Sequence, residues 1–223
     1  MTYVLYYAPG RASLAVHWML IELGVPFEAH LVDFAVKAHK SPEYLRLNPD
    51  GMIPTLVVDG KPHAECAMLA LMLAERHPES GLEIPRGASD RPDYLQWMFY
   101  FANTLQPLYR AWFYTEEVGG AESAVAVKEY ARVRIEKVWQ RVDARLHKMP
   151  YLAGSNLSAV DFHATMLMRW SRDMPKAADR WDAIAAYLKR MKAMKSFRLV
   201  HELEKLEIWP ADRSSLPKSG KTG

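Results

Sequence analysis

The chain has 223 residues, of which 50% are hydrophobic and 25% charged, a balance typical of a globular protein with one large or two small domains. Its 29 basic and 26 acidic residues are interspersed and leave a net charge of +3, so nucleic-acid binding is not indicated. No apolar run is long enough to span a membrane and the N-terminus lacks a secretory signal pattern, which together predict a cytoplasmic protein. One cysteine excludes an internal disulfide and a cysteine-based zinc cluster, and no metal site is expected because the eight histidines lack metal-ligand spacing.

The first 80 residues alternate between strand and helix patterns. Residues 3–7 form a β-rich run, residues 11–23 an apolar helix ended by Gly24, and residues 27–34 a second strand, so the first two strands should be parallel. The next elements expected are a short helix at 41–47, a third strand within 48–60, a fourth strand at 61–63 and a helix at about 65–76. This order, βαβ followed by ββα, is that of a thioredoxin-like domain.

Beyond residue 80 the strand signals nearly vanish. Residues 81–87 have the composition of a linker, and helical periodicity follows over 90–117, 121–148, 158–172, 180–194 and 196–206. We therefore predict a thioredoxin-like N-terminal domain (1–80), a linker (81–87), an all-helical C-terminal domain (88–209) and a flexible tail (210–223).

The stretch 48–60 is the most informative segment. It opens with the turn signals Asn-Pro and Asp-Gly, continues as an apolar run and closes with a second Asp-Gly, which predicts a loop, a strand and a hairpin turn. Pro54 stands where this strand begins, and a cis Ile53–Pro54 bond would turn the backbone N–H and C=O of Ile53 outward to pair with an extended peptide. The base rate of about 5–6% for cis bonds before proline favours the trans alternative.

Two motifs resemble the glutathione transferase family. Residues 48–56 are similar to its N-P-x-G-x-x-P-x-L segment, in which the residue before a cis-proline holds the cysteinyl backbone of glutathione; this implies roles for Met52, Ile53 and Pro54. Ser158 and Asp161, behind Gly154, form an acidic variant of the capping box and resemble the motif that begins a core helix of the family's C-terminal domain. The resemblance extends over roughly 2–209 and implies the α/β plus all-α glutathione transferase fold.

The resemblance also implies a set of glutathione contacts. Glu65 and Cys66 match the family's Glu-Ser pair at the start of the third helix, where the γ-glutamyl group binds, although a thiol is a weaker donor than serine. Lys37 and Lys40 match basic residues that reach the glycyl carboxylate. The alternatives are that Glu65 only favours its helix N-terminus, that Cys66 is a buried inert thiol or a redox-sensitive one, and that both lysines are solvated surface residues.

The residue that stabilises the glutathione thiolate is expected in or beside the turn after the first strand. Residues 6–15 resemble the bacterial beta-class run Tyr-Tyr-x-Pro-Gly-x-Cys-Ser-Leu-Ala, but Ala12 replaces the cysteine, so mixed-disulfide chemistry is not available there. Ser13 is then the expected hydroxyl donor to the sulfur, assisted by Arg11 and the helix N-terminus; alternatively it only caps the helix. Tyr6 and Tyr7 are further candidates, of which a regular strand allows at most one to face the thiol.

The acceptor pocket is expected between the domains, along the aromatic segment 99–114. We expect its residues to be Asn103, Gln106, Tyr109, Arg110 and Phe113, although an aromatic stripe at helical spacing is also typical of a core. Gln106 stands where the beta class has a histidine, and Pro107 should kink the helix.

These resemblances imply an enzyme. It would use glutathione as co-substrate and conjugate its thiolate to small hydrophobic electrophiles in detoxification, with peroxide reduction as a possible side activity. They also imply a homodimer, in which the third helix and the long helix after the linker meet the partner. Two alternatives remain: a non-catalytic module on the same fold that binds glutathione or another ligand, and a glutathione-dependent disulfide reductase.

Overall fold

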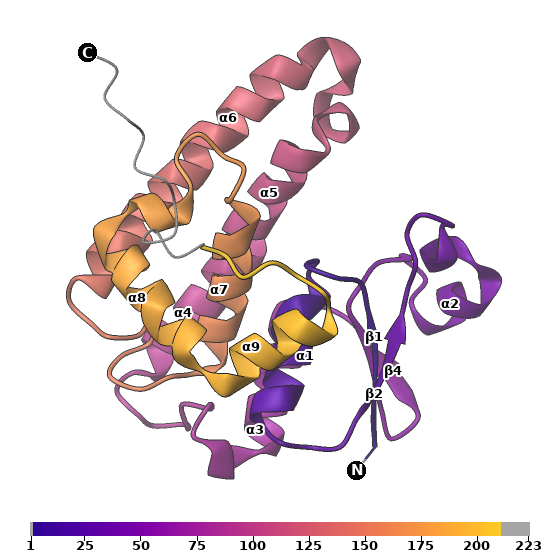
Figure 1. Cartoon of the computed structure of the whole chain (residues 1–223), viewed down its shortest axis with the longest axis horizontal. Helices are drawn as coiled ribbons and strands as arrows, with labels where there is room; N and C mark the ends of the chain where they lie inside the picture. Colours follow the sequence, from indigo (N-terminus) through magenta and orange to yellow (C-terminus); the bar gives the residue numbers. More distant parts are fainter. Residues whose placement is uncertain (1, 211–223) are drawn as a thin grey trace.

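The computed structural model describes residues 2–210 and consists of a small sheet domain packed against a larger set of helices (Figure 1). The sheet has the strand order β2-β1-β3-β4, with β2 parallel and β3 antiparallel to β1. Its elements in chain order are β1 (Tyr3–Tyr7), α1 (Ser13–Glu22), β2 (Glu28–Leu31), α2 (Pro42–Leu47), β3 (Thr55–Val58), β4 (Lys61–His63) and α3 (Cys66–Arg76). The predicted βαβ and ββα order and the parallel first pair are confirmed.

The remaining regular elements of the described chain are helical. They are α4 (Arg91–Tyr100), α5 (Gln106–Phe113), α6 (Thr115–Leu146), α7 (Ala159–Trp170), α8 (Asp182–Ala193) and α9 (Lys195–Leu203), with short helical turns at Ala38–Lys40, Pro78–Ser80 and Ala178–Arg180. The thioredoxin-like domain followed by helices is therefore present as predicted.

The segment predicted as one helix over 90–117 differs from the prediction. A single helix was expected over 90–117, but a π-helical segment, Phe101–Leu105, separates α4 from α5. Pro107 lies at the start of α5 and has no N–H to continue the α-helical hydrogen bonds, which accounts for the irregular turn before it. Helix α6 is itself kinked at Gly120, which has a non-helical φ of 72°, so its long second part follows Gly120, where the helix over 121–148 was predicted.

Helix α7 lies at the centre of the molecule. Every residue from Ala159 to Arg169 is buried, and the helix packs against α1 and α3 of the sheet domain (Figure 1). On the other side of the sheet lies α2. The helices α1, α3 and α7 therefore contribute to one continuous hydrophobic core that joins the two domains.

The capping box at the start of α7 is confirmed. The Asp161 carboxylate accepts from the Ser158 N–H at 2.9 Å, from the Leu152 N–H at 3.1 Å and from the Tyr187 hydroxyl at 3.1 Å. It is fully buried, and burial raises its pKa to about 6. This carboxylate therefore joins the start of α7 to the preceding loop and to α8.

None of the helices within residues 2–210 has the length and apolar character needed for a membrane span. Most of the predicted flexible tail, residues 211–223, lies outside the described part of the chain, as does Met1.

Candidate functional site

A cavity of about 560 Å³ opens between the sheet domain and the helices. The sheet domain supplies the loops after β1 and before β3 and the start of α3, while α5, the end of α7 and Leu206 supply the opposite wall. The lining residues are Pro9, Gly10, Arg11, Ala12, Phe34, Asn48, Asp50, Met52, Ile53, Pro54, Ala64, Glu65, Cys66, Gln106, Tyr109, Arg110, Phe113, Tyr114, Arg169, Trp170, Arg172 and Leu206.

The strip before β3 presents an unpaired backbone to this cavity. The Ile53–Pro54 bond is cis, as one of the two alternatives predicted. Asn48 Nδ2 donates to the carbonyl of Met52 at 2.9 Å and to the Thr55 hydroxyl at 3.1 Å, which holds both ends of the strip. Within the described residues, neither the N–H nor the C=O of Ile53 has a hydrogen-bond partner. The backbone of Ile53 can therefore pair with an extended peptide.

The start of α3 offers a second set of donors. The backbone N–H groups of Cys66 and Ala67 have no partner among the described residues, and the positive end of the α3 dipole lies there. Glu65, just before the helix, has a φ of 69°, a conformation that is costly for a residue with a side chain and that is found most often at functional sites. Burial raises the pKa of the Cys66 thiol to about 12, which favours the inert alternative over the redox-sensitive one.

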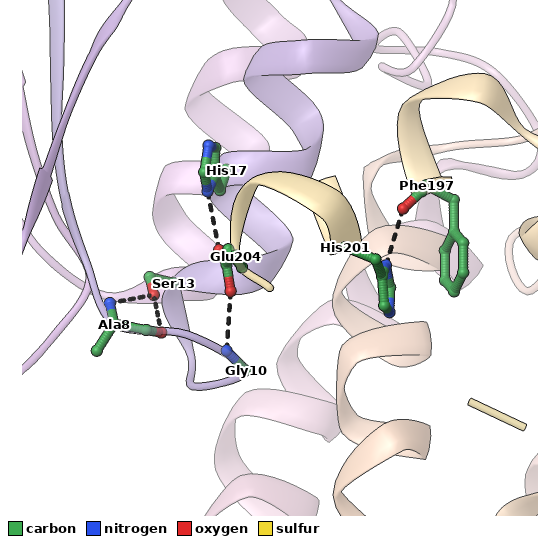
Figure 2. Close-up of polar contacts among 7 residues, drawn as sticks. All are labelled: Ala8, Gly10, Ser13, His17, Phe197, His201 and Glu204. Carbon is green, nitrogen blue, oxygen red and sulfur yellow. Dashed lines mark hydrogen bonds and ion pairs between the residues drawn. The ribbon is translucent and has the colours of Figure 1, made fainter. Parts of the chain in front are cut away.

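None of the three residues predicted to stabilise the thiolate lines the cavity. Ser13 is fully buried, and its hydroxyl lies 3.1 Å from both the N and the O of Ala8, accepting from the amide and donating to the carbonyl (Figure 2). This placement does not fit direct contact between Ser13 and a ligand sulfur. Tyr6 and Tyr7 point to opposite faces of the sheet: Tyr6 stacks on His30, and Tyr7 packs against His17.

Ala12 and Arg11 do line the cavity, at the N-terminus of α1. The N–H groups of Ala12 and Ser13 are unpaired within the described residues, so the helix start is an open anion site. The Arg11 guanidinium lies 4.2 Å from the centre of the Phe34 ring and donates to the Tyr114 hydroxyl at 3.1 Å. It forms no ion pair with a described carboxylate.

Lys37 and Lys40 are exposed and lie outside the cavity lining. The Lys40 ammonium donates to the carbonyl of Asp50 at 3.1 Å, next to the strip that ends at Pro54. Lys37 has a φ of 56° at the start of a helical turn. Neither lysine therefore contributes to the cavity lining in this structure.

Among the predicted acceptor residues, Gln106, Tyr109, Arg110 and Phe113 line the cavity, whereas Asn103 does not. A buried histidine fixes the Gln106 side chain: the Gln106 Oε1 accepts from His163 Nε2 at 3.1 Å. Burial lowers the pKa of His163 to about 4, so the ring is neutral and donates from Nε2. The amide nitrogen of Gln106 is then left to donate into the cavity.

Sequence reasoning missed the contribution of α7 and the segment after it. Arg169, Trp170 and Arg172 line the cavity, and the only sequence signal for them is the charged, aromatic end of an otherwise apolar helix. The Trp170 indole N–H donates to the carbonyl of Gly10 at 2.9 Å.

A buried carboxylate just after α9 holds the same loop. Glu204, 2% exposed, accepts from the Gly10 N–H and lies 2.8 Å from His17 Nδ1 (Figure 2). The φ of Gly10 is 68°, so a residue with a side chain would be strained there. The loop after β1 is thus fixed by two contacts from helices distant in sequence.

Among residues 2–210 there is no group of three or more His, Cys, Asp or Glu side chains suited to hold a metal ion.

Comparison with known proteins agrees with this architecture. Family models for the N-terminal and C-terminal domains of glutathione S-transferases match residues 12–76 and 103–194. A glutathione S-transferase of Xanthomonas campestris, GST-4.5, is 32% identical over 190 residues, which are 85% of this chain and 92% of that protein.

Solved structures are similar over nearly the whole chain. A glutathione S-transferase from Xylella fastidiosa superposes with a TM-score of 0.83 and 27% identity, covering 92% of this chain and 100% of that one. A sphingomonad glutathione S-transferase complexed with glutathione has a TM-score of 0.79 and 25% identity, with the same coverage of both chains. The chain therefore belongs to the glutathione S-transferase family.

Proposed function

We propose that this protein binds glutathione along Ile53 and conjugates its thiolate to small electrophiles held against α5 and α7. The observation that carries the proposal is the unpaired backbone of Ile53, which lines the same cavity as two helix N-termini with unpaired N–H groups. A γ-glutamyl carboxylate suits the start of α3, the ammonium suits Glu65, and a thiolate suits the start of α1. The glutathione complex of the sphingomonad relative supports this choice of ligand.

The thiolate would be stabilised by the α1 N-terminus and Arg11. These groups favour the charged form of the thiol and so increase the fraction of nucleophile at neutral pH. Ser13 would act indirectly, since its hydroxyl fixes the Ala8 backbone of the same loop. Lys40 and Lys37 remain the candidates for the glycyl carboxylate.

The test is isothermal titration with glutathione, followed by a conjugation assay with a chromogenic aryl halide. The thiolate sulfur bonds to the ring carbon, chloride leaves with the bonding electron pair, and the thiol proton passes to solvent. We expect micromolar to millimolar binding and measurable turnover. A hydroperoxide with a second glutathione as reductant tests the peroxidase reaction.

Two variants separate the sources of thiolate stabilisation. Arg11→Gln should lower kcat at least about tenfold, equivalent to about 1.4 kcal/mol of barrier, while glutathione still binds. Ser13→Ala should lower the thermal midpoint and change kcat less than Arg11→Gln does, because its hydroxyl contacts backbone only. The reverse order of effects would restore Ser13 as the group in contact with sulfur.

Glutathione binding without any turnover would instead favour the non-catalytic module. A disulfide reductase is less well supported, because Ala12 stands at the cysteine position and Cys66 is buried.

A homodimer would form through α3 and α4. Met68 on α3 and Phe99 on α4 are 39% and 53% exposed, as expected for apolar residues that a partner covers. Sedimentation equilibrium should give twice the monomer mass, and Phe99→Asp should weaken the dimer. A monomeric wild type would contradict this part of the proposal.

A further inference from the structure

The two walls of the cavity carry opposite net charges, although the sheet domain also contributes Arg11. The acidic residues in the lining, Asp50 and Glu65, both belong to the sheet domain. The helical wall contributes Arg110, Arg169 and Arg172 and no acidic side chain. In the proposed binding mode Glu65 faces the glutathione ammonium, so the arginines face the acceptor.

Arg169 is the least compensated of these cations. It is 8% exposed, and its Nη1 donates to the backbone carbonyl of Glu207 at 2.7 Å. Its buried Nε has no hydrogen-bond partner, and the guanidinium forms no ion pair with any described carboxylate. Burial and the neighbouring Arg172 lower the pKa of Arg169, and the more distant carboxylates of Glu204, Glu207 and Asp173 offset only part of this shift. An anion at this position would offset the remaining cost of the buried charge.

The neighbouring arginines differ in how fully they are paired. Arg110 is neutralised by Glu117, with Nη2 and Oε2 2.6 Å apart. Arg172 has a weaker partner, since its Nε lies 3.3 Å from Oδ2 of the largely exposed Asp173. The positive charge that no carboxylate of the described chain balances closely is therefore concentrated at the end of α7.

Aromatic rings adjoin this charge. Trp170 lies between the two arginines in sequence and is fixed through Gly10, and its ring meets that of Tyr109 edge-on with centroids 5.6 Å apart. The Phe113 ring stacks on Tyr109 at 5.9 Å. A flat apolar body would fit against these rings while a charged substituent reached the arginines.

We propose that the acceptor substrate is an anionic electrophile, an aromatic or apolar body bearing a carboxylate that Arg169 and Arg172 bind. This proposal rests on the proposed function and specifies its substrate class. The arginines would bind the carboxylate while the reacting carbon, at the other end of the molecule, faced the thiolate at the start of α1. A planar guanidinium suits a carboxylate because it can donate two parallel hydrogen bonds.

The kinetic test compares two substrates that differ only in charge. One is a chlorodinitrobenzoate with both nitro groups ortho to the chlorine and the carboxylate para to it; the other is its methyl ester. In both, sulfur bonds to the ring carbon and chloride leaves with the electron pair. With each kcat/KM divided by the uncatalysed rate constant, the wild type should prefer the acid at least about tenfold, equivalent to about 1.4 kcal/mol.

Three variants locate that preference. Arg169→Gln and Arg172→Gln should each reduce the acid-to-ester ratio at least about fivefold, with the ester rate reporting an intact site, and Arg172→Lys should restore part of it. Arg172→Gln keeps the test valid if Arg169→Gln fails to fold, because Arg172 is exposed. Arg198→Gln, an exposed arginine of α9 outside the lining, is the matched control and should leave the ratio unchanged.

A binding measurement separates this inference from the proposed function. Dinitrobenzoate and its methyl ester, both without chlorine, are titrated calorimetrically in the absence of glutathione. Tighter binding of the acid, lost in Arg172→Gln, supports the inference even if glutathione does not bind and the proposed function fails. Equal binding of acid and ester, or turnover of the ester with no preference for the acid, overturns the inference and leaves the proposed function standing.

Discussion

At the residue scale, the site depends on one buried carboxylate. Glu204 lies just past α9, yet it holds Gly10 and His17 at the other end of the chain (Figure 2). A buried carboxylate is tolerated only when its partners are in place, so Glu204, His17 and the Gly10 amide are interdependent.

We expect Glu204→Ala to lower the free energy of unfolding by at least about 2 kcal/mol, because the Gly10 N–H and the buried His17 ring lose the acceptor that they share. Urea denaturation followed by tryptophan fluorescence measures this change. The matched control is Glu202→Ala in the last turn of α9, where the side chain is exposed and an effect within about 0.5 kcal/mol is expected. Equal effects in the two variants would show that Glu204 is not a structural link.

Individual residues show what the sequence could and could not predict. The cis bond at Pro54 and the positions of Ile53, Glu65 and Gln106 in the cavity followed from the resemblance of local motifs to a known family, whereas the base rate alone favoured a trans bond. The burial of Ser13 did not, because a serine at a helix start can turn toward solvent, ligand or backbone with the same local sequence.

At the element scale, α7 connects most of the features described. It is buried along its length, begins at the Asp161 capping box and ends at the arginines of the cavity. The helix pattern predicted its position closely, since 158–172 was expected and Ala159–Trp170 is found. Its role in the cavity was not predictable, because that role depends on how α7 packs against α1 and the loop after β1.

We expect Asp161→Ala to lower the free energy of unfolding by at least about 2 kcal/mol, because several buried donors lose their acceptor along with the helix cap. Differential scanning calorimetry measures the loss. Asp182→Ala, at the exposed start of α8, removes only a favourable charge–dipole interaction worth about 0.3–1 kcal/mol. An unchanged midpoint for Asp161→Ala would refute the structural role of the box.

The interruption between α4 and α5 shows a limit of periodicity. Apolar spacing over 90–117 continues through Pro107, so a pattern alone predicts one helix. The π-helical segment arises because the backbone must accommodate a missing donor, which depends on hydrogen bonding and not on side-chain spacing.

At the scale of the whole molecule, the buried histidines make stability depend on pH. Burial lowers the pKa of both His163 and His201 to about 4, whereas an unfolded histidine titrates near 6.5. Above pH 6.5 these histidines are neutral in both states, and the stability that they contribute is fully present. As the pH falls from 6.5 toward 4, the unfolded chain binds protons that the folded chain does not, so the free energy of unfolding decreases. Asp161, with its raised pKa, acts in the opposite direction over the same range and offsets part of the loss.

We expect His201→Asn to lose less stability on acidification than the wild type, because asparagine keeps a donor where Nδ1 bonds the Phe197 carbonyl and does not titrate (Figure 2). Between pH 7.5 and pH 5 the difference should be about 2 kcal/mol, from the 1.36 kcal/mol carried by each pKa unit. Urea titrations of both proteins at the two pH values measure it. Parallel losses would show that His201 is not the titrating group.

The buried state of Cys66 has a practical consequence for experiments on this protein. Since the chain contains one cysteine and its thiol is enclosed in the core, thiol-specific reagents should react with free glutathione and leave the folded protein unmodified. Glutathione consumption can then be followed directly in the presence of the enzyme. A cysteine introduced on either wall of the cavity would be the single reactive position, so a spin or fluorescent label attached there could report ligand binding in the cavity.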